Sequence, residues 1–269
     1  MAGRATQTRK SNCSMNRIAA LCAELGRAIE KAAGRAEPLP ERRFHKHKDY
    51  LSYGLKSADF YALMKRFRPR FVELTLDERL ELAASLLGDH IGELGHTGIY
   101  ILALSTTELK QRHFTTLDRL MDDFRSWSHV DHFCSEVLKP LLNLERRETL
   151  AWVERWNRSD NRFKRRASVV LFTRKVAESA EFTVEVLRLC ENLLQDREEI
   201  VRKGVGWALK DNLRSAPQRL LPYIVDLRRR GISSTIVLYA IRDLKGPERE
   251  RVLAVKKNQD RTSSGWQGE

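Results

Sequence analysis

Apolar residues along this chain recur mainly with the spacing of an amphipathic helix. Residues 76–87 place apolar side chains at i, i+4, i+6 and i+7, and the pattern stops at Gly88, as is typical of a helix with one buried face. No alternating pair of segments and no Asn-Gly turn indicates a β-hairpin. The pattern therefore predicts an all-α fold. The same spacing predicts further helices over residues 163–176, 182–194, 198–213 and 219–227.

Two predicted helix starts in the second half of the chain are similar. Residues 160–166, DNRFKRR, match residues 196–202, DREEIVR, at an offset of 36 positions. Asp160 and Asp196 could each cap a helix by accepting a backbone amide, and Arg166 and Arg202 would then lie on a solvated face. Helical units with a period of about 40 are typical of HEAT-like repeats, which stack into an α-solenoid with a concave surface. Chance similarity between two amphipathic helices is the alternative.

The length of 269 residues suits one large domain. The expected linkers, such as residues 139–141 and 159–161, are short, so we expect a single domain over residues 15–256, with disordered segments at 1–14 and 257–269. No stretch has the apolar length of a membrane span, and the N-terminus lacks the apolar core of a secretory signal. The four cysteines are widely spaced without a CxxC pair. That spacing argues against a zinc site or disulfides and favours a reducing cytosol.

The formal net charge of +13 suggests a polyanionic partner, and nucleic acid is the common one. A basic surface without a specific partner is the alternative. Four cations crowd the start of the helix predicted from residue 163, where the helix dipole disfavours them, so an anionic partner is favoured there. We therefore expect a concave basic face whose candidate contacts to a nucleic-acid backbone are Arg162, Lys164, Arg165, Arg166, Arg202 and Lys203.

Two tryptophans stand in unusual surroundings. Trp127 and Asp131 are four residues apart, so they share a helix face, although Asp131 does not fit the core stripe of Phe133, Val137 and Leu138. A surface Asp beside a half-buried Trp is the alternative. Near Trp207, Gly204 and Gly206 lie inside a predicted helix, where each costs about 1 kcal/mol relative to Ala. They could admit a neighbouring helix or a ligand backbone, or simply accompany a core Trp.

Together these stretches resemble the AlkD-like DNA alkylation repair family, whose members are DNA glycosylases built from HEAT-like repeats. The similarity spans roughly residues 40 to 250. Two departures are visible: Ser-His-Val separates Trp127 from Asp131, where relatives often have another acid after the Trp, and Ala58 replaces a Pro. The matching stretches are WSHVD at 127–131, SDN at 159–161 followed by RA at 166–167, GWAL at 206–209, and YGLKS at 53–57, similar to the family's Tyr/Phe-x-Gly-x-Lys-Thr-Pro element.

The resemblance implies a role for each matching residue. Asp131 matches the catalytic acid, and Trp127 and Trp207 match the indoles that flank the deoxyribose of the lesion. Arg166 matches an arginine near the acid and the DNA backbone. When the bond between a base and its deoxyribose breaks, the sugar gains the positive charge of an oxocarbenium ion. A carboxylate and the faces of two indoles can stabilise such a charge.

The implied reaction is hydrolysis of the N-glycosidic bond of cationic N3- or N7-alkylated purines in double-stranded DNA, without full base flipping. Lys56 and Ser57 would contact the DNA. The resemblance implies no metal, no cofactor and no Schiff-base lysine, so no strand cleavage is expected. We further expect a monomer in the cytoplasm, associated with the nucleoid.

Two other functions stay open. One is a noncatalytic HEAT-repeat protein that binds damaged or branched DNA, and the other is a solenoid that binds proteins. The intact set of Trp127, Asp131, Arg166 and Trp207 favours the enzyme over the noncatalytic binder. The excess of positive charge favours either of these over a protein-binding solenoid.

Overall fold

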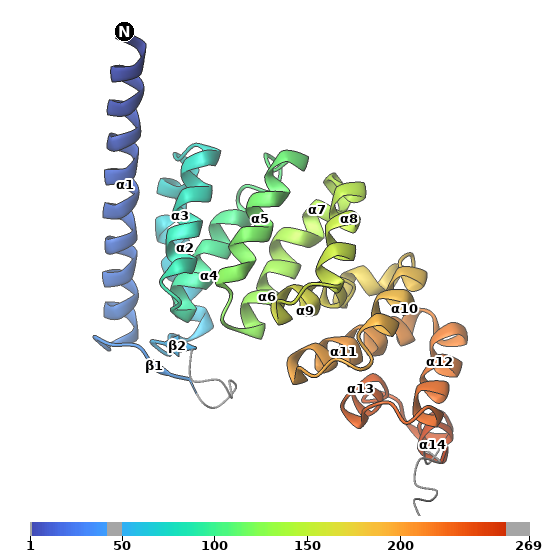
Figure 1. Cartoon of the computed structure of the whole chain (residues 1–269). Coiled ribbons are helices and arrows are strands. Elements are labelled where there is room, and N and C mark those ends of the chain that lie inside the picture. Colours follow the sequence, from blue (N-terminus) through green and yellow to red (C-terminus); the bar gives the residue numbers. More distant parts are fainter. Residues whose placement is uncertain (1, 42–49, 257–269) are drawn as a thin grey trace, which may run out of the picture. The chain divides into compact units, whose positions relative to one another are not determined.

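The computed structural model describes residues 2–41 and 50–256, and most of that range is helical (Figure 1). The predicted all-α fold is confirmed. A short antiparallel pair of strands, β1 (Leu39–Pro40) and β2 (Leu51–Ser52), was not predicted. The chain divides into two compact units, Met1–Trp152 and Val153–Glu269, and the division falls inside helix α8 (Arg146–Asn157). That residues 15–256 act as one domain stays a prediction.

The first unit contains the two strands and helices α1 to α7. Helix α3 begins and ends where the sequence predicted, because Thr75 and Glu78 form a capping box at its start. The other elements are α1 (Ala2–Ala33), α2 (Ser57–Val72), α3 (Leu76–Gly88), α4 (Gly92–Ala103), η1 (Gln111–His113), α5 (Phe114–Leu120), η2 (Met121–Asp123), α6 (Trp127–Phe133), η3 (Cys134–Leu138) and α7 (Lys139–Leu144).

The first unit has a core built largely from α1, α2, α3 and α4. One face of α1 contributes Ile18, Leu21, Leu25 and Ile29, at the i, i+3, i+4 spacing of an amphipathic helix. Aromatic side chains of α2 complete this core, including Phe71, which is fully buried. The burial of these side chains is what fixes α1 to the unit, because burying one large apolar side chain contributes about 1.5–3 kcal/mol.

Two expectations from the sequence differ from the structure here. Residues 2–14, which were expected to be disordered, belong to α1. The stretch at residues 139–141, expected to be a linker, is helical: it begins α7, which follows the π-helical segment η3 without a break, so Pro140 lies inside a helical run and removes one backbone donor from it. The predicted disorder of residues 257–269 lies outside the described residues. No described helix has both the length and the apolar character needed to span a membrane.

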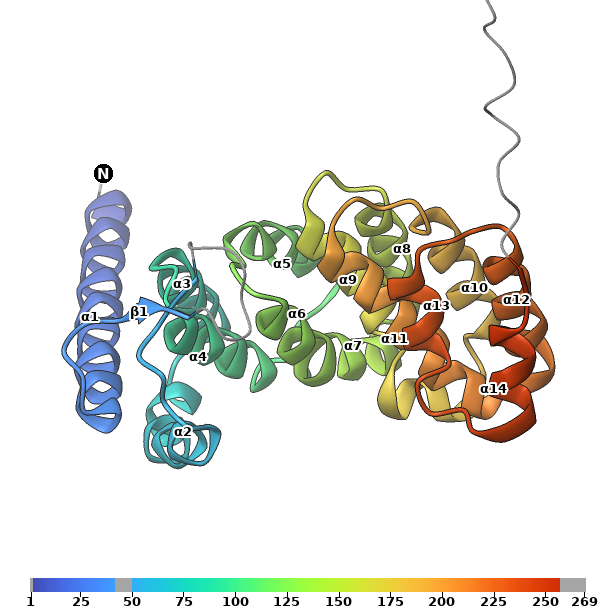
Figure 2. The ribbon, with the colours of Figure 1, turned by 90° about the horizontal axis from the view of Figure 1, so that it is seen from below.

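The second unit contains the end of α8 and the helices that follow it (Figure 2). Helix α9 is shorter than the predicted 163–176, because the chain leaves the helical conformation after Val170 and Arg174 adopts a positive φ of 52°. The elements are α9 (Arg162–Val170), η4 (Arg174–Ser179), α10 (Thr183–Asn192), α11 (Glu199–Ser215), α12 (Pro217–Arg229), α13 (Ser234–Ala240) and α14 (Gly246–Leu253).

The structure corrects the register of the sequence repeat. Asn161, and not Asp160, caps α9, with its side chain accepting a hydrogen bond from the next-but-one backbone amide. The corresponding N-cap position of α11 is Glu198, 37 positions later rather than 36. Asp196 lies two residues before that position and accepts a hydrogen bond from the Glu198 amide at 2.8 Å. Each residue of the first repeat therefore corresponds to the residue 37 positions later, one position beyond the partner predicted from the sequence.

Helix α11 packs against α9 on one side and α13 on another. The two glycines of α11 make these contacts close. A Cβ at Gly204 would lie 3.3 Å from Val170 of α9, and a Cβ at Gly206 would lie 2.7 Å from Tyr239 of α13. Among the possibilities left open by the sequence, close approach by neighbouring helices therefore accounts for both glycines.

Candidate functional site

Helix α6 presents Trp127 and Asp131 away from its buried face. Ser126 caps the helix by accepting a hydrogen bond from the Ser128 amide at 2.9 Å. The buried residues of α6 are His129, Val130 and Phe133, whereas Trp127 and Asp131 are both half-buried. Because they are one helical turn apart, the indole and the carboxylate share a partly exposed face, as predicted.

The helix that carries Asp131 continues into a π-helical segment, η3. Phe133, Val137 and Leu138 are fully buried, so the predicted core stripe is confirmed. In a π-helix each backbone hydrogen bond joins residues five apart rather than four, and such segments occur often at functional sites. The π-helical segment begins three residues after Asp131 and changes which positions face the core from there on.

The departure from the family pattern at Ser128 and His129 has a structural explanation. His129 is 1% exposed, and its Nε2 lies 3.0 Å from the carbonyl oxygen of Gly92 on α4. Gly95 makes room for the ring, because a Cβ there would lie 2.6 Å from it. Ser128 Oγ lies 3.2 Å from His96 Nε2. Both residues therefore join α6 to α4.

A pair of histidines continues this contact between α4 and α6. His96 Nδ1 lies 3.1 Å from His132 Nδ1, so one ring donates and the other accepts. Burial lowers the pKa of His132 from its ordinary value to about 4, against the opposing effect of Glu136. Within the described part of the chain, no group of three or more His, Cys, Asp or Glu side chains is arranged to hold a metal ion.

The predicted DNA contacts of the first unit follow a tightly held loop. Lys56 is the N-cap residue of α2 and Ser57 its first residue, and both are exposed. The buried carboxylate of Glu93 accepts hydrogen bonds from the amides of Tyr53 and Leu55 at 3.0 and 3.1 Å, and from the Ser52 hydroxyl at 2.8 Å. One carboxylate on α4 therefore fixes the loop that leads to Lys56.

In the second unit, Arg166 is buried rather than solvated. It is 5% exposed, and its Nη1 donates to the carbonyl oxygen of Ile200 at 2.6 Å. The expectation of a solvated Arg166 is therefore wrong, because its side chain crosses to the first turn of α11. Lys164 is also buried, at 7% exposure.

The other predicted backbone contacts already have partners within the protein. Arg165 donates to Asp196 at 2.6 Å and to two carbonyl oxygens of the loop before α9. Arg162 lies 3.7 Å from Glu198, and Lys203 lies 2.8 Å from Glu199. Acids at or just before the start of α11 therefore offset the positive charge that seemed to need an external anion.

Arg202 has the same kind of partner as Arg165. It donates to the carbonyl oxygens of Asp196 and Arg197, in the loop before its own helix, and it is half-buried. The expectation of a solvated Arg202 is therefore wrong as well. Its role as a DNA contact, like that of the other cations, stays a prediction.

Trp207 is half-buried on α11, and a cation covers one of its faces. The Arg174 guanidinium carbon lies 5.0 Å from the centre of the Trp207 ring, within the range of a cation–π interaction. Asp211, one turn after Trp207, is 6% exposed and accepts a hydrogen bond from the Arg174 amide at 2.8 Å. Neither Arg174 nor Asp211 was identified from the sequence.

The candidates thus fall into two pairs. Trp127 and Asp131 share a face of α6 in the first unit. Arg166 and Trp207 lie on α9 and α11 of the second unit, where Arg166 contacts the first turn of α11 through the carbonyl oxygen of Ile200.

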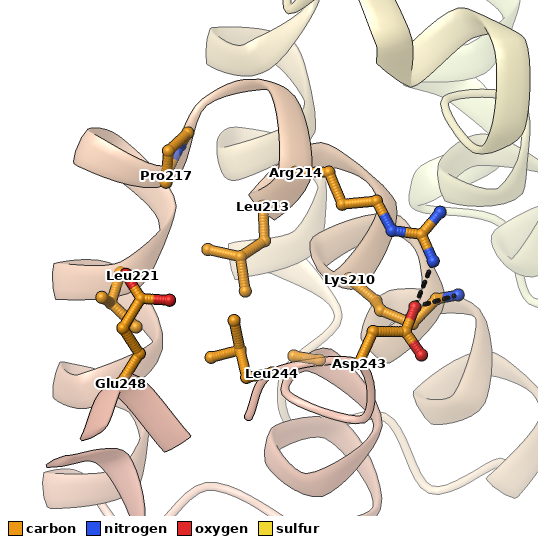
Figure 3. Close-up of a pocket in the computed structure, with 9 residues that line it drawn as sticks. Lys210, Leu213, Arg214, Pro217, Leu221, Asp243, Leu244 and Glu248 are labelled. Atoms are coloured by element: carbon orange, nitrogen blue, oxygen red, sulfur yellow. Dashed lines mark hydrogen bonds and ion pairs between the residues drawn. The ribbon is translucent and has the colours of Figure 1, made fainter. Parts of the chain in front are cut away.

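A pocket of about 310 Å³ lies beside α11, α12 and α14 in the second unit (Figure 3). Leu213 and Leu244 point into it, and Asp243 accepts hydrogen bonds from Lys210 and Arg214 at one side. Burial raises the pKa of Asp243, but these two hydrogen bonds outweigh burial and hold the pKa below its ordinary value. None of the predicted site residues lines this pocket, and its Asp243 carboxylate is already paired with cations, so we assign no reaction to it.

A comparison with family models and a comparison with solved structures each found a match. The model of a family described as DNA alkylation repair enzyme matches residues 27–244. A solved structure described as "Predicted DNA alkylation repair enzyme from Enterococcus faecalis" is similar with a TM-score of 0.63 and 14% identity, over 73% of this chain and 89% of that chain. At that identity the likeness shows a shared fold. No match was found among curated proteins.

Proposed function

This chain belongs to the DNA alkylation repair enzyme family, and from that premise we propose that it is a monofunctional DNA glycosylase. The substrate we propose is double-stranded DNA that contains a cationic N3- or N7-alkylated purine. The reaction is hydrolysis of the N-glycosidic bond, with the base left largely stacked and the DNA strand uncut. Membership of the family links the chain to the repair of alkylation damage and to DNA. The substrate class and the reaction are our proposal.

The chemistry of the lesion suits a carboxylate beside an indole. Alkylation at N3 or N7 gives the purine a positive charge and so weakens its bond to the sugar. As that bond breaks, the deoxyribose gains oxocarbenium character. A preorganised carboxylate at Asp131 would stabilise that charge or orient the attacking water, and the face of Trp127 would stabilise a cation by about 0.5–2 kcal/mol.

The observation that carries this proposal is the position of Asp131. A carboxylate on the buried face of α6 could not reach a substrate. Asp131 lies off that buried face and is partly exposed, one turn after Trp127. By the family resemblance, Trp207 would be the second indole that contacts the DNA at a lesion. The resemblance gives Arg166, whose guanidinium donates to the Ile200 carbonyl, a role at the DNA backbone.

Replacing Asp131 by Asn tests the proposal. The amide keeps the shape of the side chain and removes its charge, so the rate of base release should fall on the order of 10²–10³-fold, while binding of duplex DNA survives. The measurement is single-turnover release of 7-methylguanine from a methylated duplex. Glu136→Gln is the matched control, because Glu136 is an exposed acid a little over one turn later in the same run of helix. It should leave the rate unchanged.

The outcomes separate the candidate functions. Equal rates for the wild-type chain and Asp131→Asn would remove Asp131 from the mechanism. A wild-type chain that binds duplex DNA but releases neither 7-methylguanine nor 3-methyladenine would support the noncatalytic DNA-binding function instead. A chain that does not bind DNA would exclude both.

A further inference from the structure

Arg174 has an unusual backbone conformation that the second unit holds in place. Its φ of 52° lies in the left-handed region, which a residue with a long side chain seldom adopts. The Arg174 amide donates to Asp211 Oδ2 at 2.8 Å, and Asp211 is buried, with Lys210 Nζ at 3.1 Å from its other oxygen. A charged and buried acceptor therefore fixes the point from which the Arg174 side chain starts.

The far end of the same side chain is also placed by α11. The Arg174 guanidinium lies over Trp207, and Trp207 precedes Asp211 by one helical turn, so both contacts come from one face of α11. The guanidinium donors lie in the plane of the group. Contact of the cation with an indole therefore leaves donors available for a planar or tetrahedral anion.

The charge of Arg174 is not offset in the way that neighbouring charges are. Arg165 and Lys203 are paired with acids of α11 and the loop before it, and Lys175 is paired with Glu178 at 3.2 Å. Among the side chains that the structure describes, no carboxylate is within ion-pair distance of the Arg174 guanidinium, which is exposed. An exposed arginine, fixed at both ends and lacking an acid, is suited to bind phosphate.

We propose that Arg174 is a positioning residue that binds a DNA backbone phosphate next to the nucleotide contacted by Trp207. This inference rests on the role proposed for Trp207. The phosphate would fix the position of the strand at the indole, so that Arg174 acts on the reaction through the placement of the DNA. Because the Arg174 guanidinium lies over the Trp207 ring, the same residue would link phosphate binding to the access of a nucleotide to the indole.

The decisive variant is Arg174→Gly. Glycine adopts a positive φ without strain and keeps the amide that Asp211 accepts from, so the melting temperature should be unchanged or higher. Loss of one phosphate contact should make the slope of log affinity against log salt concentration shallower by about 0.9 for undamaged duplex DNA. Arg174→Lys should keep the slope, because lysine also neutralises one phosphate. Lys175→Ala is the matched control, since Lys175 is adjacent, exposed and already paired, and it should keep the slope too.

The salt slope is independent of base release, so the two proposals can fail separately. A folded Arg174→Gly protein with the wild-type slope overturns the role of Arg174, whatever the result for Asp131. A shallower slope in Lys175→Ala as well as in Arg174→Gly also overturns it, because the effect would then be one of general surface charge. A shallower slope for Arg174→Gly alone, in a chain that releases no base, would support Arg174 and contradict the glycosylase. A wild-type chain that does not bind duplex DNA overturns both.

Discussion

Replacing Gly206 by Ala should destabilise the second unit, although alanine is the better helix former. A Cβ at this position would lie 2.7 Å from Tyr239 Cβ and 3.0 Å from the carbonyl oxygen of Ile236. Neither atom belongs to the flexible end of a side chain, so neither can move without α13. Helix α11 and α13 would have to separate, or the residues beside Gly206 would have to adopt strained positions.

The magnitude follows from two opposing terms. Overpacking of a close contact costs about 1–3 kcal/mol, and the change from Gly to Ala inside a helix contributes about 1 kcal/mol in the other direction. Because both contacts involve atoms near the backbone, we expect the upper part of the range, a net loss of about 1–2 kcal/mol. For a protein of this size such a loss lowers the melting temperature by roughly 2–8 °C.

Gly204→Ala is the control for this prediction because it lies in the same helix. Its Cβ would lie 3.3–3.4 Å from side-chain carbons of Val170, Arg166 and Val169, and such atoms can yield by a few tenths of an ångström. The packing cost and the helix gain should nearly cancel. Calorimetry and urea unfolding of both variants give the comparison. A Gly206→Ala protein as stable as the wild-type chain would refute the close approach of α11 and α13.

Three further predictions concern single side chains. Arg165→Ala should cost about 2–4 kcal/mol in urea unfolding, because it leaves the 5%-exposed Asp196 carboxylate without its cation, and a variant of full stability would contradict this role. Lowering the pH from about 6.5 to 4 should destabilise the wild-type chain more than the His132→Gln variant. At pH 5 the difference in the loss of unfolding free energy should reach about 2 kcal/mol. The unfolded chain protonates His132 near its ordinary pKa whereas the folded chain does so only at about 4, so parallel pH–stability curves would refute it. Glu93→Gln should lower the melting temperature of the chain. The amide nitrogen would replace a buried oxygen that accepts a hydrogen bond and would face N–H or O–H donors instead, at a cost of about 1–3 kcal/mol. An unchanged melting temperature would show that the loop does not depend on Glu93.

The helices could be predicted where their ends are set by neighbouring residues. Helix α3 has the predicted bounds because the capping box of Thr75 and Glu78 and the end of the apolar pattern at Gly88 are local signals. Helix α9 ends earlier than its apolar pattern, and the segment that the pattern extended as helix contains Arg174, whose amide is held by Asp211, 37 residues away in the sequence. No local signal in the sequence carries a contact of that kind.

In the candidate site, too, features set by neighbouring residues could be predicted from the sequence, and features set by distant residues could not. The shared face of Trp127 and Asp131 follows from helix geometry, and the structure places both on the partly exposed side of α6. The neutralisation of Arg162 and Arg165 could not be predicted, because the acids that pair with them lie just before the next helix of the repeat, far away in the sequence. The unpredicted Arg174 lies in a segment that the sequence pattern extended as regular helix.

The corrected register also changes which residues of the repeat are equivalent. At an offset of 37 positions, Arg165 corresponds to Arg202, and each donates to two carbonyl oxygens of the loop before its own helix. These two arginines therefore perform one repeated structural task, which requires no ligand. Arg166 then corresponds to Lys203, and here the repeat is broken: Lys203 is exposed and pairs within its own helix, whereas Arg166 is buried and donates to Ile200 of the next helix. A position where the two repeats differ in this way is not explained by the needs of the repeat itself. At an offset of 36, Arg166 would be matched with Arg202 and this difference would not be visible. The difference distinguishes Arg166 from Arg165, whose contacts are structural, and favours a role for Arg166 that is specific to this part of the chain.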